Sequence, residues 1–250
     1  MLTGTAAIDD LAATAPTLSA FATEPLACPG ADLVQVVHEV WVDEGGREAM
    51  VPPALHPVNP PCLTWSFLRA PESVVGPFTL AQTRLVCRSG VRARGLHLAA
   101  FTDNAAAGQL LASQWGLHFP VPVADVRLVR RYDRIDGTVA VDGGVVLDVS
   151  LIGPQPLNAG DLQFTDTMTL AHTPMGLRLV QVEQSYAMNR AERARTVVHR
   201  FEGEAWGRPV LRPSYPVSAS AAVADVTFEP VRFVCRPDES AFTGTERVSS

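Results

Sequence analysis

Short apolar segments that alternate with polar residues run along most of the chain and predict β-strands. In the first part of the sequence they are LVQVVHEVWV (33–42), CLTWSFLRA (62–70), FTLAQTRLVC (78–87) and GLHLAAF (95–101). In the second part they are VADVRLVRRY (123–132), TVAVDG (138–143), VVLDVSLIG (145–153), DLQFTDTMTL (161–170), LRLVQVEQSYAM (177–188), TVVHRFEGEAW (196–206) and VADVTFEPVRFVC (223–235). A period of two and many β-branched residues are typical of strands. Asp142-Gly143-Gly144 predicts a hairpin turn between two of them.

One segment has a helical pattern instead. Asp103-Asn104 supplies good N-cap residues, AAAGQLLASQW (105–115) follows, and Gly116 is a typical C-cap. About ten strands around one main helix predict an α+β, mostly β fold of curled, barrel-like antiparallel sheets that hide their edges. We expect an irregular N-terminal arm over residues 1–30 with at most one short helix, a single domain over 31–236, and a flexible tail over 237–250.

Composition narrows the class of protein. The 250 residues are 47% hydrophobic and 18% charged, which indicates a globular chain. The net charge of −6 argues against nucleic acid as a partner. No apolar run approaches the ~20 residues of a membrane span, and the N-terminus lacks the basic start of a signal peptide. We therefore expect a cytoplasmic protein without a membrane partner. The four cysteines lack ligand spacing, so we expect buried free thiols.

Common catalytic and binding motifs are absent from the sequence. There is no GxSxG, GxxxxGK[ST] or GxGxxG motif, and the six histidines show neither HxH nor HExxH spacing. We expect no metal site and no cofactor. All twenty basic residues are arginine, so the chain has no lysine. Only its N-terminal amine could therefore form an imine with a carbonyl substrate.

From about Pro52 to Asp238 the chain resembles the acetoacetate decarboxylase family. The resemblance lies in VVGPFTL (74–80), LHLAAFTDN (96–104), the helix ending in QWG (114–116) and RPSYPVSASAAVADVTF (212–228). In that family a strand carrying Gly-x-Tyr/Phe-x-Glu precedes a strand ending in Asp-Asn. A helix then leads into Trp-Gly-Phe-Pro-Lys-Lys. In the family the second of these lysines forms a Schiff base with the substrate ketone, because a neighbouring cation lowers the pKa of its amine. The resemblance implies a homo-oligomer.

The family's catalytic residues are replaced here. Counting from Gly116, His118 takes the position of the family's proline, and Phe119 and Pro120 take those of the two lysines. Leu80 stands at the position of the strand glutamate. Imine chemistry is thereby excluded, while the resemblance implies that the cavity remains as an apolar pocket with a few polar groups.

We predict that His118 borders this cavity and acts as a general acid/base or hydrogen-bond donor. The alternative for His118 is a turn residue that faces solvent or a backbone carbonyl. The predicted substrate-binding residues are Ser66, Leu80, Gln82, Gln114, Trp115, Phe119 and Gln181. Of these, we expect Leu80, Phe119 and Gln181 to line the same cavity as His118. Trp115 and Phe119 are expected as core or pocket wall, and Arg69 and Arg84 on a solvated strand face.

These residues favour an enzyme of specialised, polyketide-like metabolism such as antibiotic biosynthesis. It would be a cyclase (cycloaddition included) or a lyase acting on a hydrophobic intermediate, which it would hold in a reactive shape through one or two hydrogen bonds. The alternatives are a non-catalytic binder of a hydrophobic small molecule and a His-assisted decarboxylase or dehydratase. A structural pseudoenzyme is a further reading if Trp115 and Phe119 fill the pocket.

Overall fold

The computed structural model describes residues 2–43 and 45–248, most of which form β-strands. The strands are β1 (Leu26–Trp41), β2 (His56–Pro57), β3 (Cys62–Ala70), β4 (Phe78–Ser89), β5 (Arg92–Thr102), β6 (Asp125–Arg130), β7 (Arg134–Val141), β8 (Gly144–Pro156), β9 (Thr167–Thr173), β10 (Gly176–Val182), β11 (Gln184–Phe201), β12 (Arg212–Phe228), β13 (Phe233–Cys235) and β14 (Thr245–Arg247). The α-helices are α1 (Ile8–Ala12), α2 (Ala105–Trp115) and α3 (Ala241–Gly244), and the 3-10 helices are η1 (Glu48–Met50), η2 (Ala159–Asp161) and η3 (Gly203–Trp206).

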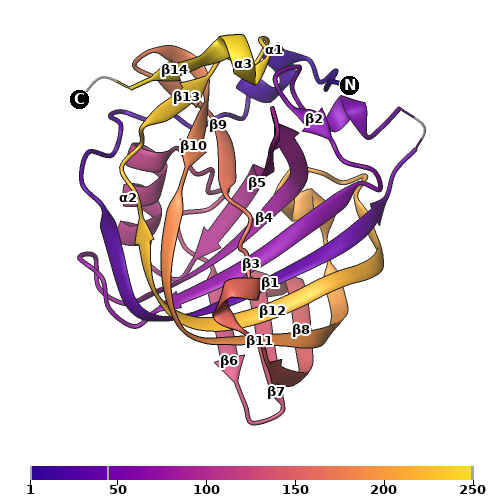
Figure 1. Ribbon diagram of the computed structural model, residues 1–250, viewed down its shortest axis with the longest axis vertical. Coiled ribbons are helices and arrows are strands. Elements are labelled where there is room, and N and C mark those ends of the chain that lie inside the picture. The colour runs from indigo at the N-terminus through magenta and orange to yellow at the C-terminus, as the bar shows by residue number, and fades with distance from the viewer. Residues whose placement is uncertain (1, 44, 249–250) are drawn as a thin grey trace.

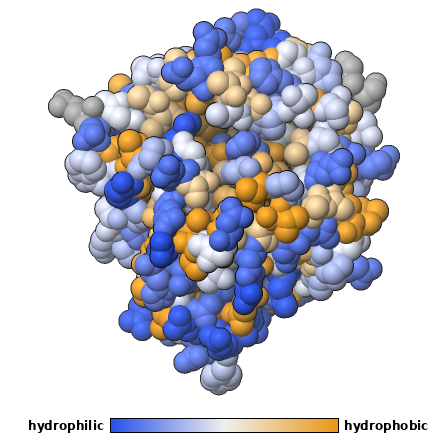
Figure 2. Space-filling model, turned by 180° about the vertical axis from the view of Figure 1, so that it is seen from behind, coloured by the Kyte–Doolittle hydropathy of each residue, from blue (hydrophilic) through white to orange (hydrophobic). Residues whose placement is uncertain are grey.

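The fourteen strands belong to one curled sheet, which confirms the predicted mostly β, antiparallel fold (Figure 1). Its order is β14-β13-β10-β9-β5-β4-β3-β1-β12-β11-β8-β7-β6, and β2 pairs with β4 off this path. Among the described strands, β5 and β9 pair in parallel and the other neighbours are antiparallel. The face of the molecule that points away from the viewer in Figure 1 carries both hydrophobic and polar side chains around a shallow hollow (Figure 2). Within the described residues, no helix has the length and hydrophobicity needed to cross a membrane.

Helix α2 forms where the sequence predicts it, because both of its ends are capped. Asn104 Oδ1 accepts hydrogen bonds from the backbone N–H groups of Ala106 (2.9 Å) and Ala107 (3.2 Å). Gly116 ends the helix with a φ of 73°, a left-handed conformation that glycine adopts without strain. The C-cap fixes the direction in which the chain leaves the helix toward His118.

The predicted hairpin is also present. Asp142 (φ 50°) and Gly143 (φ 80°) form the turn between β7 and β8, where Val141 pairs with Gly144. Positive φ at both central turn residues matches the right-handed twist of the two strands.

Two hydrophobic cores lie on opposite sides of the central strands. On β3, Trp65 and Phe67 belong to the core shared with β6, β7 and β8, whereas Leu68 belongs to the core shared with α2. The alternation of side chains along a strand separates these two faces. The four cysteines are free and buried, as predicted.

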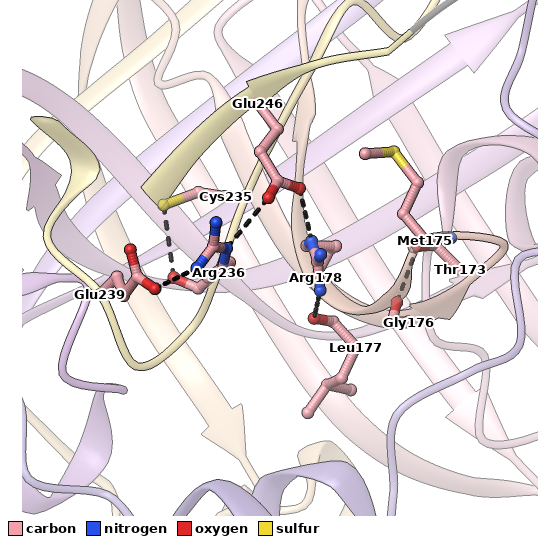
Figure 3. A network of polar contacts seen from close by, with 9 residues as sticks. All are labelled: Thr173, Met175, Gly176, Leu177, Arg178, Cys235, Arg236, Glu239 and Glu246. Carbon is pink, nitrogen blue, oxygen red and sulfur yellow. Dashed lines mark hydrogen bonds and ion pairs between the residues drawn. The ribbon is translucent and has the colours of Figure 1, made fainter. Parts of the chain in front are cut away.

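Both ends of the chain contain strand residues that the sequence analysis does not predict. β1 begins at Leu26, inside the expected irregular arm, because its pairing with β12 continues past a register shift between Cys28 and Ala31. In the expected flexible tail, β14 pairs with β13, and Glu246 accepts hydrogen bonds of 2.9 Å from both Arg178 and Arg236 (Figure 3). Of these two predicted segments, residues 1, 249 and 250 lie outside the described residues.

Candidate active site

Three of the predicted binding residues share a very small cavity on the α2 side of the sheet. The register places Ser66 opposite Gln82 and Leu68 opposite Leu80, so these side chains lie together on one face of β3 and β4. Ser66, Leu80 and Gln82 line a cavity of about 20 Å³. A volume of that order holds a single water molecule. The interior is therefore too small for the hydrophobic intermediate expected from the sequence.

The segment between η2 and β9 fills this interior. Gln35 Oε1 accepts a hydrogen bond from the Thr165 backbone N–H (2.9 Å), and Gln35 Nε2 donates to the Gln163 carbonyl oxygen (3.2 Å). The ring of Phe164 packs against that of Tyr186, with centroids 4.9 Å apart. These contacts hold the segment across the face that carries Ser66, Leu80 and Gln82.

Arg84 is buried on the same face, which corrects the expectation of a solvated position. Its side chain is 2% exposed and donates from Nη1 to Thr167 Oγ1 (3.0 Å) and to the Thr165 carbonyl oxygen. Gly95 leaves room for it, because a Cβ there would lie 2.9 Å from Arg84 Cβ. Burial lowers the pKa of Arg84, but a guanidinium keeps its proton in proteins. Arg69, by contrast, is exposed and pairs with Asp32.

His118 borders a different and larger cavity, of about 160 Å³. The cavity is lined by His118 with residues from α1, β5, β9 and the turn after η3, among them Asp10, His97, Thr169, Trp206 and Arg208. His118 is half-buried, and burial lowers the pKa of its imidazole. The ring forms no hydrogen bond with the described residues.

The main chain holds His118 in place on both sides. Its carbonyl oxygen accepts from the Ala100 N–H (2.8 Å), and its N–H donates to His97 Nε2 (3.2 Å). The same Nε2 lies 3.4 Å from the His118 carbonyl oxygen, to which it donates in the other tautomer, and Nδ1 of His97 is buried without a hydrogen-bond partner. Burial lowers the pKa of His97 to about 3, so this imidazole is neutral near pH 7.

The other predicted binding residues lie apart from His118. Trp115 is buried in the core and donates from Nε1 to the Glu229 carbonyl oxygen (2.8 Å), as expected of a core or wall residue. Gln114 is half-buried, and its carbonyl oxygen accepts from the Ala22 N–H (3.0 Å). Phe119 packs near Gly108 of α2.

Gln181 lines a third cavity, together with Arg94, Phe233 and Phe242. The structure thus does not bring His118, Leu80, Phe119 and Gln181 into one cavity. Alternation along β10 sends Val180 and Val182 into the α2-side core and Gln181 away from it. The loop after Gly116 buries Leu117 in that core and places His118 at the other cavity.

The structure adds two residues to the site that the sequence analysis did not select. His97 comes from β5, and Arg208 comes from the turn that follows η3. The described residues contain no group of three or more His, Cys, Asp or Glu side chains placed to hold a metal ion.

The low pKa of His97 leads to a prediction about stability. Between pH 7 and pH 5 the unfolded chain gains most of a proton at this histidine, whose ordinary pKa is 6.5, while the folded chain does not. Stability therefore decreases as the pH falls, and His97 alone is expected to lower the free energy of unfolding by about 2 kcal/mol at pH 5. Urea unfolding of the wild type and His97→Gln at pH 5, 6 and 7 measures this difference.

Glutamine at position 97 can still accept the His118 N–H while it removes the titrating ring. An unaltered pH dependence in His97→Gln would contradict the assignment of a neutral, buried His97.

Comparison with known proteins identifies the fold but no sequence relative. No family model matches the chain, and no curated protein matches it. Among solved structures, acetoacetate decarboxylase from Legionella pneumophila subsp. pneumophila str. Philadelphia 1 superimposes with a TM-score of 0.71 at 18% identity, covering 87% of this chain and 88% of that one. The enduracididine biosynthesis enzyme MppR complexed with pyruvate has a TM-score of 0.63 at 17% identity, covering 83% and 88%.

An acetoacetate decarboxylase-like enzyme from Sphingomonas wittichii RW1 gives a TM-score of 0.60 at 14% identity, covering 83% of this chain and 91% of that one. These superpositions cover 83–87% of the chain at 14–18% sequence identity. The chain therefore has the acetoacetate decarboxylase fold in a strongly divergent form, as the resemblance in its sequence predicts.

Proposed function

We propose that this protein is an enzyme of specialised metabolism that cyclises or cleaves a hydrophobic intermediate with His118 as its acid–base group. The observation that carries the proposal is the half-buried imidazole of His118, which borders a cavity, has no hydrogen-bond partner among the described residues and has a lowered pKa. Such a ring is neutral at pH 7 and ready to take a proton from a substrate.

The reaction proceeds without an imine. The chain contains no lysine, and Phe119 and Pro120 stand where the resemblance places the two lysines. A substrate carbonyl therefore has no internal amine to attack it. Catalysis must come from proton transfer, from fixed charges and from the shape of the cavity.

His118 and Arg208 have complementary tasks at this cavity. The imidazole of His118 removes a proton from the substrate, and the released electron pair either closes a ring or expels a leaving group. The guanidinium of Arg208 favours negative charge that develops on a substrate oxygen during this step. The protonated imidazole then returns its proton to the product or to the leaving group, which restores the neutral ring.

Among the proteins that share the fold, the enduracididine biosynthesis enzyme MppR is named for a biosynthetic pathway and was solved with pyruvate. This supports an enzyme of biosynthesis as the general class. The cavity beside Ser66, Leu80 and Gln82 is too small for such a substrate, and this favours binding at the larger His118 cavity.

Turnover experiments test the proposal. The purified protein is incubated with a panel of polyketide-like hydrophobic compounds, and products and bound compounds are measured by mass spectrometry. We expect a cyclised or cleaved product to form in catalytic amounts. Binding without turnover across the panel would instead make the protein a non-catalytic binder.

Borohydride reduction in the same mixtures separates the two kinds of chemistry. With acetoacetate or pyruvate we expect no reduced adduct on any side chain, because the sequence offers no lysine amine. Peptide mapping locates any adduct. A stable adduct on an internal residue would contradict imine-free chemistry.

A further inference from the structure

The His118 cavity has a larger, apolar neighbour. This second cavity measures about 380 Å³ and is lined largely by apolar groups, including Trp41, Val42, Met50 and Val210. Asp10, Leu11 and Arg208 line both cavities. The two cavities therefore meet at a common wall, formed by one side of α1 and by Arg208.

Arg208 lacks a counter-ion at this wall. Its Nη1 donates to the neighbouring Gly207 carbonyl oxygen (3.3 Å), and its Nε is buried without a partner. No carboxylate of the described residues lies within 4.0 Å of it, not even that of Asp10, whereas arginines such as Arg94 and Arg178 do face carboxylates. A partly desolvated guanidinium is stabilised by an anion that its N–H groups can hold.

The backbone around Arg208 is fixed before any ligand binds. The Arg208 N–H donates to the Gly203 carbonyl oxygen (2.8 Å), and the Leu211 N–H donates to the Arg208 carbonyl oxygen (3.2 Å). A Cβ on Gly203 would lie 2.3 Å from that same carbonyl oxygen, so only glycine permits this close turn. The guanidinium is thus presented from a rigid turn, which suits a binding group.

Large apolar side chains remain exposed beside it. Trp41 is 61% exposed and Val210 is 66% exposed, and both line the second cavity. Exposed apolar groups that gather around a cavity mark a place where hydrocarbon surface binds.

We propose that this pair of cavities binds an amphipathic organic carboxylate, with its carboxylate on Arg208 and its hydrocarbon body against Trp41, Val42 and Val210. A ligand held in this way has its carboxylate at the wall that the two cavities share. The role of His118 in this arrangement rests on the proposed function, whereas binding of the carboxylate rests on Arg208 and the apolar cavity.

Calorimetric titration of the full chain with octanoate, butyrate and 1-octanol tests this inference. We expect the wild type to bind octanoate at least tenfold more tightly than either of the other two, because only octanoate supplies both the charge and the hydrocarbon body. Arg208→Gln should weaken octanoate binding at least tenfold and leave octanol binding unchanged. Trp41→Ser should reduce the preference for octanoate over butyrate.

Two further variants serve as controls for charge. Arg88→Gln removes an exposed arginine that lines neither cavity, and it should leave all affinities unchanged. Asp10→Asn removes one of the two acidic side chains that line the second cavity, the other being Asp43, and should strengthen octanoate binding. Equal affinities for octanoate and octanol in the wild type, or unchanged octanoate binding by Arg208→Gln, would overturn the inference.

His118→Ala separates this inference from the proposed function. It should bind octanoate within about threefold of the wild type, because the imidazole is not the anion-binding group. Loss of turnover with intact octanoate binding supports both proposals. Intact turnover in His118→Ala overturns the catalytic role of His118 alone, and failure of octanoate to bind to the wild type overturns the substrate class alone.

Discussion

His118→Ala is expected to lower kcat at least about 100-fold, because general acid–base catalysis by one side chain contributes typically 10²–10⁴-fold. The imidazole borders the cavity without a hydrogen-bond partner among the described residues, so its loss removes the proton carrier and leaves the surrounding hydrogen bonds in place. Steady-state kinetics on the substrate found in the turnover panel measures the effect. A loss of only a few-fold would mean that His118 serves as cavity wall.

The controls for this variant separate chemistry from structure. His199→Ala removes a histidine that lies on an exposed strand position away from the cavity, and it should retain full activity. His118→Ala should unfold at the same urea concentration as the wild type within experimental error, because both main-chain hydrogen bonds of residue 118 remain. Added imidazole should restore part of the activity of His118→Gly by entering the vacated space.

The pH profile of the wild type offers an independent readout. Burial lowers the pKa of His118 below its ordinary value of 6.5, and the neutral ring is the form that accepts a proton. The value of kcat/KM should therefore rise with pH through an apparent pKa below 6.5 and then level off near neutrality. The His118→Ala variant should lack this rise. A profile that climbs through a pKa above 6.5 would contradict a buried imidazole base.

The elements predicted best are those whose signals are local. Asn104 and Gly116 cap α2 through contacts within a few residues, so the sequence alone locates the helix. Residues 26–30, by contrast, belong to the expected irregular arm, yet they lie inside β1, because pairing with the distant strand β12 carries β1 through a bulge. Long-range pairing of this kind outweighs local preference.

The candidate site was only partly predictable for the same reason. Ser66, Leu80 and Gln82 share a face because of strand periodicity, which the sequence displays. What fills that face is the segment from Gln163 to Thr165, which is brought there by hydrogen bonds to Gln35, and no local pattern reveals it. The sequence pattern predicts a solvent-facing Arg84, but in the structure that segment covers its side chain.

Arg208 could not be selected from the sequence at all. It follows a glycine in a turn and has the composition of an ordinary surface loop, so its sequence carries no signal of function. Its significance comes from what surrounds it in space, namely two cavities and, among the described residues, no carboxylate within 4.0 Å.

Gly137→Val is expected to destabilise the fold by at least about 3 kcal/mol, at the upper end of what overpacking a core usually costs. A Cβ at this position of β7 would lie 2.6 Å from Cε2, 2.8 Å from Cζ and 2.9 Å from Cδ2 of Phe67. Phe67 is fully buried among the β6–β8 core residues, so its ring has no free space into which it can move. Urea unfolding at pH 7 measures the change.

Gly144→Val is the matched control on the neighbouring strand β8. A Cβ there would meet nothing closer than the Val141 carbonyl oxygen at 3.5 Å, an ordinary contact, so this variant should cost less than about 1 kcal/mol. The comparison separates the introduction of a β-branched side chain from the clash with the ring. Equal costs for the two variants would contradict the contact between β7 and Phe67.

A double-mutant cycle assigns the cost to that contact. Phe67→Leu removes the three ring carbons that a side chain at position 137 would strike, so Gly137→Val should be less harmful in its presence. We expect a coupling energy of about 1–3 kcal/mol between the two changes, because residues in direct contact depart from additivity by amounts of this order. The missing side chain of Gly137 is what allows β7 to lie directly against the ring of Phe67 on β3. A cycle without coupling would mean that the fold tolerates the larger residue by shifting β6–β8 as a unit, and the close packing of these strands on the central sheet would then not depend on Gly137.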